Sequence, residues 1–325
     1  MNIQRTDLQM EAASKALHTD STLQPLEIWD EYLAEDRDYY YEWLSMDLRD
    51  PEKRLSDSAA DSLMAGELVE FLADPNLIPL YDSIQKTIPS GTAFIETSLI
   101  PPLKRLSEAY PNLMIPMIRT HINGYDPSGH PQMVDQVVFT DHYLTLGIHY
   151  FLGPDLAYYS PNIPGFLRRR FQLDYLPVLV MRDMAEGEGI IAPMPGGKQP
   201  TFLDQMIRAG IKQYFLQEML PYTPDSMRLL YTDSQMDWAN TYESRIYKEL
   251  MGSFYDTNFL NFRDYLSDKP YTTQLSSESA PRIGEYLGWK IVNAYMNRHP
   301  EVTLSELTAD QNYDQIFKSS KYRPA

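Results

Sequence analysis

Helical periodicity in the second half of the chain is the feature that most narrows its fold. Thr201 followed by Asp204 forms a capping-box pattern, and apolar residues then recur every three or four positions. These apolar positions are Leu203, Met206, Ile207, Ile211, Tyr214 and Phe215. A second stripe follows Ser234 with Asp237, and a third follows Pro281, a residue type that is common at helix starts. These patterns predict amphipathic helices that each need a partner to cover one face.

The first half of the chain is also predicted to be mainly helical, with a few extended segments. Helical stretches are expected at residues 25–48, 62–72, 76–88 and 92–110. Residues 113–122 form the best strand candidate, and Pro116 within them is typical of an edge strand or a bulge. Turn-forming residues follow at 123–129, and residues 136–140 are again extended in character. The predicted fold class is therefore α+β, predominantly helical, with a small sheet packed among helices.

Composition predicts a folded chain, and the length permits one large domain or two modest ones. The 325 residues are 43% hydrophobic and include 24 Tyr, 12 Phe and 4 Trp, which is enough to build a substantial core. The Gly- and Pro-rich stretch at 186–200 is interpreted as a surface loop and not as a domain boundary. We expect a single domain over residues 1–325, with an acidic helical part at 1–110 and a core at 111–325.

The charge of the chain limits its partners. The formal net charge is −17, and residues 1–75 alone carry a net charge of −12. Such a field repels phosphate backbones and anionic lipid headgroups, so we expect neither nucleic acid nor a charged membrane surface as a partner. The chain has no cysteine, which excludes disulfides and thiolate metal sites. No apolar run approaches the roughly 20 residues that a membrane-spanning helix needs.

Motifs of common enzyme classes are missing from the sequence. It contains six histidines but no H-E-x-x-H pattern, no G-x-S-x-G elbow and no phosphate-binding glycine loop. His142 and His149, the closest pair, are seven positions apart. On a helix they would lie about 10 Å from each other, too far to share one zinc ion unless the segment is not helical. The residues alone therefore predict a mostly helical protein without a recognisable active site.

A family resemblance is carried by several blocks in the C-terminal two thirds of the chain. The most distinctive is Glu278-Ser-Ala-Pro-Arg-Ile-Gly284, followed by Tyr286-Leu-Gly-Trp-Lys-Ile-Val292 and, near the end, Gln315-Ile-Phe-Lys-Ser-Ser-Lys-Tyr-Arg-Pro324. Further blocks lie at 141–153, 201–221 and 231–243. Together they resemble the GldB family, the gliding-motility-associated lipoproteins of Bacteroidetes. The resemblance covers about residues 110–325. The chain departs from the family pattern where Ala280-Pro281 replaces Pro-Gly, and at Tyr242 and His149.

This resemblance implies a zincin-like architecture, distantly related to metallopeptidases. The helix at 203–220 would take the place of the zinc-binding helix, and Met206, Ile207 and Gly210 would align with its His, Glu and His positions. Zinc needs imidazole nitrogens at such positions, and a general base needs a carboxylate. These three residues provide neither. The resemblance therefore implies a degenerate peptidase with no catalytic activity and no metal or other cofactor.

Five residues are candidates for a cleft or binding site. Asp141 and His142 belong to one of the family blocks. Glu243 stands where a zincin of this type carries its third, acidic ligand; alternatively it is a surface carboxylate paired with Arg208 or Arg245.

The other two candidates are Glu278 and Arg282, which lie in the most distinctive block. An arginine at the first turn of a helix opposes the helix dipole, which suggests a specific carboxylate partner, and the Arg282–Glu278 pair would serve either structure or binding. Tyr322 is expected to dock the C-terminal segment onto the body of the protein.

The function implied by the resemblance is that of a non-catalytic cell-envelope lipoprotein. It would face the periplasm, be held by a lipid on an N-terminal cysteine that this chain lacks, and support gliding or secretion machinery by contact with envelope proteins. Alternatively, this member is not anchored. Two other functions remain open: a divergent hydrolase that uses metal or carboxylates, with His142 or His149, and a peptide- or glycan-binding module that reuses the old cleft.

Overall fold

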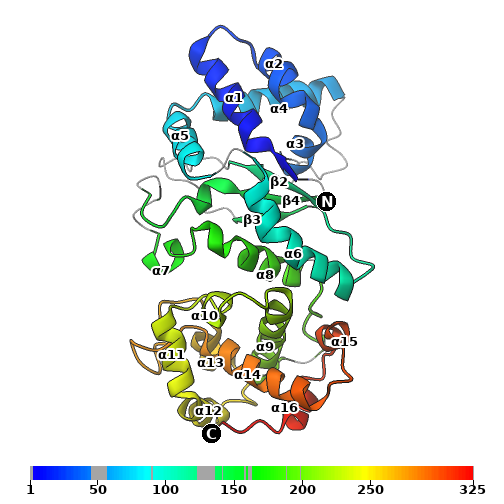
Figure 1. Ribbon diagram of the computed structural model, residues 1–325, viewed down its shortest axis with the longest axis vertical. Coiled ribbons are helices and arrows are strands. Elements are labelled where there is room, and N and C mark those ends of the chain that lie inside the picture. Colours follow the sequence, from blue (N-terminus) through cyan, green and yellow to red (C-terminus); the bar gives the residue numbers. More distant parts are fainter. Residues whose placement is uncertain are drawn as a thin grey trace. The chain divides into compact units, whose positions relative to one another are not determined.

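The computed structural model describes residues 3–44, 57–88, 91–122, 136–140, 142–156, 159, 163–187, 189–197 and 199–324 (Figure 1). Contacts between residues divide the chain into two compact units. Unit 1 comprises Met1–Ser98 and Met114–Asp174, and unit 2 comprises Leu99–Leu113 and Tyr175–Ala325. The division of the chain by contacts thus differs from the expected subdivision at residue 110, and the assignment of the whole chain to a single domain stays a prediction.

Unit 1 contains a four-stranded sheet. Its strands are β1 (Ile3–Arg5), β2 (Met117–His121), β3 (Val137–Phe139) and β4 (Tyr143–Gly147), arranged in the order β1-β2-β4-β3. β2 runs parallel to both β1 and β4, and β3 is antiparallel to β4. The expectation of an edge strand at 113–122 is therefore wrong. Pro116 lies just outside β2, so its missing N–H removes no hydrogen bond from the ladder. The expected turn at 123–129 lies outside the described residues.

Helices make up most of the rest of unit 1. They are α1 (Thr6–Thr19), α2 (Pro25–Ile28), the π-helical turn η1 (Trp29–Leu33), the 3₁₀ turn η2 (Ala34–Asp36), α3 (Arg37–Leu44), α4 (Asp57–Leu72), α5 (Leu77–Thr87), the 3₁₀ turn η4 (Ile148–Phe151) and α7 (Gly165–Arg168). The single helix expected at 25–48 is thus broken into four pieces over its described part, 25–44. The pieces wrap a core in which Trp29, Tyr39, Tyr40 and Tyr81 are almost completely buried.

The regular elements assigned to unit 2 among its described residues are all helices. Its elements are α8 (Leu176–Gly187), α9 (Phe202–Met219), α10 (Asp225–Arg228), α11 (Asp233–Thr241), α12 (Glu243–Met251), α13 (Phe259–Leu266), α14 (Ile283–Arg298), α15 (Leu304–Ala309) and α16 (Tyr313–Ser320). The helix α6 (Ala93–Ala109) and the 3₁₀ turn η5 (Leu173–Tyr175) contain residues of both units. α9 and α14 pack side by side at the centre of unit 2 (Figure 1).

Local capping signals place some of these helix starts correctly and others not. The Thr201 hydroxyl accepts a hydrogen bond from the Asp204 N–H at 3.1 Å, and the Asp204 carboxylate accepts one from the Thr201 N–H at 2.8 Å, which confirms the predicted capping box of α9. The box expected from Ser234 with Asp237 is wrong, because Thr232 and Gln235 form it two residues earlier. Pro281 precedes α14 by two positions.

Candidate functional site

The face of α9 that the family resemblance singles out is covered by α14. Met206 and Ile207 are completely buried. A Cβ atom added to Gly210 would lie 2.2 Å from the backbone carbonyl carbon of Gly288, and one added to Gly288 would lie 2.0 Å from the carbonyl oxygen of Met206. The two helix backbones therefore touch at this crossing, which is possible only because neither glycine has a side chain. The backbone of α14 at Gly288 and Trp289 thus occupies the space beside Gly210.

Glu243 opens α12 and joins three parts of unit 2. Its carboxylate accepts hydrogen bonds from the Tyr286 hydroxyl at 2.8 Å and from the Tyr322 hydroxyl at 2.6 Å, and it pairs with the Lys290 Nζ at 3.2 Å. Partial burial raises the pKa of Glu243, but the two tyrosine hydrogen bonds and the Lys290 charge outweigh it and hold the pKa below its usual value. The expected docking of the C-terminal segment through Tyr322 is confirmed.

The alternative expectation for Glu243, a pairing with Arg208 or Arg245, is wrong. The cation beside Glu243 is Lys290, whereas Arg208 binds Glu186. From the sequence an arginine was expected because Arg245 follows Glu243 by two positions and Arg208 lies in the predicted helix at 203–220. Lys290 follows Tyr286 by one helical turn on α14, and only the packing of α12 against α14 brings both side chains to the same carboxylate.

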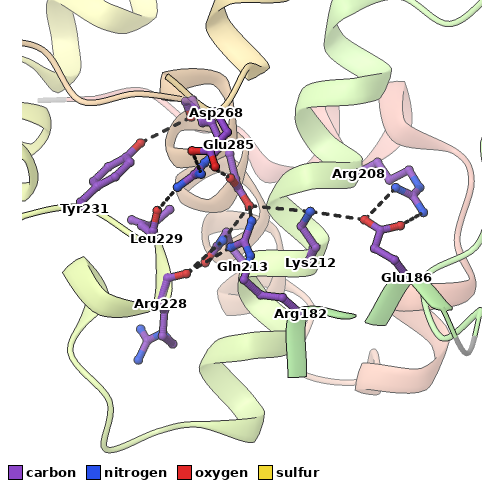
Figure 2. A network of polar contacts seen from close by, with 11 residues as sticks. Arg182, Glu186, Arg208, Lys212, Gln213, Arg228, Leu229, Tyr231, Asp268 and Glu285 are labelled. Atoms are coloured by element: carbon purple, nitrogen blue, oxygen red, sulfur yellow. Dashed lines mark hydrogen bonds and ion pairs between the residues drawn. The ribbon is translucent and has the colours of Figure 1, made fainter. Parts of the chain in front are cut away.

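Arg282 contacts three residues of a buried polar network, Asp268, Leu229 and Glu285, which Figure 2 labels. It is the N-cap of α14, with a φ of +44° in the left-handed region. Its guanidinium donates to the Asp268 carboxylate and to the Leu229 carbonyl, and its Nε lies 3.0 Å from the Glu285 Oε2. The expected carboxylate partner of Arg282 thus exists, but it is not Glu278, and that part of the expectation is wrong. Glu278 is exposed, and its backbone N–H donates to the Ser276 hydroxyl at 3.2 Å.

Glu285 is the buried acid that holds this network together. Its carboxylate accepts hydrogen bonds from Arg182 Nη2 at 2.9 Å and from the Gln213 amide at 2.7 Å, and Lys212 Nζ lies 4.0 Å away. Burial raises the pKa of Glu285, but the charges of Arg182, Lys212 and Arg282 outweigh it and hold the pKa far below its usual value. Glu285 was not among the residues predicted from the sequence. The available signal was an acidic residue three positions after Arg282, within an otherwise apolar stripe.

The network continues outward to the surface of unit 2. Glu186, near the end of α8, accepts hydrogen bonds from the Arg208 guanidinium and pairs with Lys212 at 3.3 Å. A cavity of about 360 Å³ opens here, with Arg182, Arg282 and Glu285 also in its lining. Burial and the nearby Arg182 charge lower the pKa of Lys212, although Glu285 and Glu186 oppose this shift. The residue after Leu229, Leu230, also has a positive φ, +56°, so two strained positions adjoin the site.

The remaining candidates of the sequence analysis belong to unit 1. Asp141 lies outside the described residues. His142 precedes β4, its side chain is largely exposed, and its Nδ1 lies 2.7 Å from the Glu42 carboxylate.

His149 lies beyond β4 and is completely buried. The His142–His149 segment is therefore not a helix, and because the five residues of β4 extend over roughly 16 Å, the two histidines cannot share a metal ion. Neither ring nitrogen of His149 has a hydrogen-bond partner among the described residues, and burial together with the neighbouring His121 lowers its pKa to about 3. In the part of the chain that the structure describes, no three His, Asp or Glu side chains lie close enough to hold a metal ion.

Comparisons with known proteins place the chain in a family. No curated protein matches it, and no solved structure matches it. None of the helices in the described residues is both long enough and apolar enough to span a membrane. The family model described as gliding motility protein GldB matches residues 1–324. Because this match extends over nearly the whole chain, the protein belongs to the GldB family of gliding motility proteins.

Proposed function

We propose that this member of a gliding motility family is a non-catalytic component of the gliding apparatus that acts through contacts with other envelope proteins. The supporting observation is the α9–α14 crossing. Met206, Ile207 and Gly210, which the family resemblance would align with the catalytic helix of a zincin, serve helix packing and offer a thioether, a hydrocarbon chain and no side chain. A zinc hydrolase needs nitrogen and oxygen ligands there. The zincin-like relationship is part of this proposal, as an ancestral architecture.

The proposal also concerns where the protein acts. The family description as a gliding motility protein agrees with a place in the cell envelope. We propose that the protein is a lipoprotein that faces the periplasm. Its partners in this proposal are envelope proteins, and its contact with the membrane is made through the lipid.

Metal analysis and a motility assay on matched variants test the non-catalytic role. Protein purified without chelator is analysed for bound metal, as wild type and with Glu243→Gln, Tyr322→Phe or His142→Ala. The same variants are expressed in a strain that depends on the protein for gliding. Tyr322→Phe removes one hydrogen bond to Glu243 but keeps the carboxylate, so it separates a structural role of this residue from a chemical one.

We expect much less than one metal ion per chain in every sample, and gliding at the wild-type rate in all variants that reach the wild-type protein level. One zinc ion per chain that is lost in Glu243→Gln but kept in Tyr322→Phe, with loss of gliding in the same variant, would contradict the proposal and favour a divergent hydrolase.

A further inference from the structure

The cavity beside α9 has a charge opposite to that of the protein as a whole. The chain carries a formal charge of −17. Among the residues that the structure describes, the charged ones in the cavity lining are the cations Arg182, Arg208, Lys212 and Arg282 and the carboxylates Glu186 and Glu285. The lining is thus positive overall, and the cavity volume of about 360 Å³ is sufficient for a small ligand or the end of a peptide.

The two carboxylates of the cavity differ in how firmly they are held. Glu285 is buried, with a side-chain exposure of 4%, and is fixed by hydrogen bonds from Arg182 and Gln213. The Glu186 side chain is 39% exposed, and its described partners are Arg208 and Lys212. Glu285 is therefore a permanent part of the site, whereas Glu186 can be replaced on its two cations at low cost.

Arg208 and Lys212 together form a receptor for a carboxylate group. Arg208 Nη1 and Nη2 lie 3.2 and 2.6 Å from the two carboxylate oxygens of Glu186, a two-pronged geometry that matches a planar carboxylate. Lys212 Nζ lies 3.3 Å from one of the same oxygens. The Arg208 Nε also donates to the Ala192 carbonyl at 3.0 Å, so the guanidinium stays in place when Glu186 moves away.

Burial makes this receptor stronger than an exposed pair of cations. The side chains of Arg208 and Lys212 are only about one fifth exposed, 21% and 19%. Lys212 also lies near Arg182, and that repulsion adds to the cost of keeping the Lys212 charge buried. An added anion lowers this cost, and the attraction is only weakly screened by water in such a place.

We propose that this cavity binds a carboxylate group of a ligand, which displaces Glu186 from Arg208 and Lys212 while Glu285 stays bound to Arg182 and Arg282. Glu186 is then an internal competitor that occupies the site when ligand is absent. The carboxylate belongs to a free small di- or tricarboxylate or to the C-terminus of a peptide. This site is independent of the proposed role in gliding.

Calorimetric titration of the full chain tests the proposal at fixed pH and ionic strength. The probes are citrate, a short peptide with a free C-terminal carboxylate, the same peptide with an amidated C-terminus, and inorganic phosphate. The variants are Glu186→Gln, Lys212→Met and Arg208→Gln. Lys248→Met serves as the matched control, because Lys248 is an exposed lysine on α12 away from the cavity lining.

Removal of Glu186, the internal competitor, should raise the affinity for a carboxylate, whereas removal of a cation should lower it. Glu186→Gln should tighten binding about tenfold, and Lys212→Met and Arg208→Gln should each weaken it about tenfold or more, because a hydrogen bond to a charged group contributes on that scale. Lys248→Met should bind as the wild type does. The tightening in Glu186→Gln cannot result from misfolding, so it keeps the test valid even where a cation variant folds poorly.

The results distinguish a free acid from a peptide terminus as the source of the carboxylate, and they also show whether the proposal fails. Binding of citrate supports a free acid, and binding of the free-acid peptide but not of its amide supports a peptide terminus. The proposal is overturned by no binding of either at millimolar concentration, by unchanged affinity in Glu186→Gln, by equal effects of Lys212→Met and Lys248→Met, or by phosphate binding as tightly as the carboxylates.

Discussion

Arg282 has a backbone conformation that its residue type disfavours. A left-handed φ costs a side chain other than glycine on the order of 1–2 kcal/mol. Contacts from three directions hold it: the Asp268 carboxylate, the Leu229 carbonyl and the Glu285 carboxylate. The Tyr231 hydroxyl adds a long hydrogen bond of 3.4 Å to the Arg282 carbonyl. The side-chain contacts of one residue thus fix where α14 begins.

Glu285→Gln should destabilise unit 2 strongly. The substitution keeps the shape of the side chain but leaves the charges of Arg182, Lys212 and Arg282 without their shared buried anion. Loss of one partner from a buried ion pair costs about 3–5 kcal/mol, and we expect a decrease of that order in the free energy of unfolding, measured by urea titration at pH 7.

Glu278→Gln is the matched control, because it changes the same residue type at an exposed position seven residues earlier. Its effect should stay within about 0.5 kcal/mol. Similar losses in the two variants would show that Glu285 does not hold the network together.

The sequence of α9 predicts the helix itself but not the helix that packs against it, α14. The capping box and apolar stripe of α9 predict the helix and its buried face correctly. They do not predict what covers that face, because Gly288 lies 78 positions after Gly210. From the sequence alone, Gly210 and Gly288 could equally lie in turns. Only the packed structure shows that they let two helix backbones touch.

Gly210→Ala should destabilise the protein through this crossing. The new Cβ would lie 2.2 Å from the Gly288 carbonyl carbon, and both atoms belong to rigid helices, so α9 and α14 must move apart. We expect a loss of about 1–3 kcal/mol or more in the free energy of unfolding, measured by urea titration.

Gly66→Ala is the control for this substitution. Gly66 lies within α4, and nothing is found within 4 Å of an added Cβ, so alanine should stabilise that helix by roughly 0.5–1 kcal/mol. Equal stability of wild type and Gly210→Ala would mean that the helices are not in backbone contact.

The sheet of unit 1 was predicted only in part. The strands β2 (Met117–His121) and β3 (Val137–Phe139) lie within the segments 113–122 and 136–140 that were expected to be extended, but β1 and β4 were not recognised. β1 has only three residues. β4 has five, of which four are buried, so buried and exposed side chains do not alternate along it. So short a buried segment carries no periodic signal. The parallel pairing of β1 with β2 joins residues more than a hundred positions apart, such as Ile3 and Ile118, which no local pattern indicates.

At the scale of the whole molecule, the two units contain buried titratable groups that respond to different pH ranges. The pKa of His149 in unit 1 is lowered from 6.5 to about 3, because its charged form is disfavoured by burial. The stability that neutral His149 allows is complete above pH 6.5 and is lost as the pH falls toward 3. The pKa of Glu285 in unit 2 is lowered from 4.5, so the stability that its charged form contributes is lost only when the pH falls below about 4.5.

Acidification from pH 7.5 to pH 5 should therefore weaken unit 1 and spare unit 2 with respect to these two groups. The His149 shift corresponds to a loss of about 2 kcal/mol at pH 5. Hydrogen exchange followed by mass spectrometry, corrected for the intrinsic pH dependence of exchange, should show reduced protection in β2 and β4 but not in α9 and α14. In His149→Phe, which keeps an aromatic ring beside Tyr150, the loss in unit 1 should be smaller. An identical pH response of wild type and His149→Phe would contradict this assignment.

The sequence by itself determined the mainly helical fold class, the strongly acidic charge, the lack of cysteine chemistry and the motif blocks of the GldB family. These properties are local or additive: helix periodicity joins residues three or four apart, and net charge is a sum over the chain. The tertiary structure alone decided which polar side chains meet. Arg182 and Glu285 are 103 positions apart, and Glu186 and Arg208 belong to different helices. Buried charges are tolerated only where partners surround them, and partners separated by so much chain are assembled by packing, which no local pattern encodes.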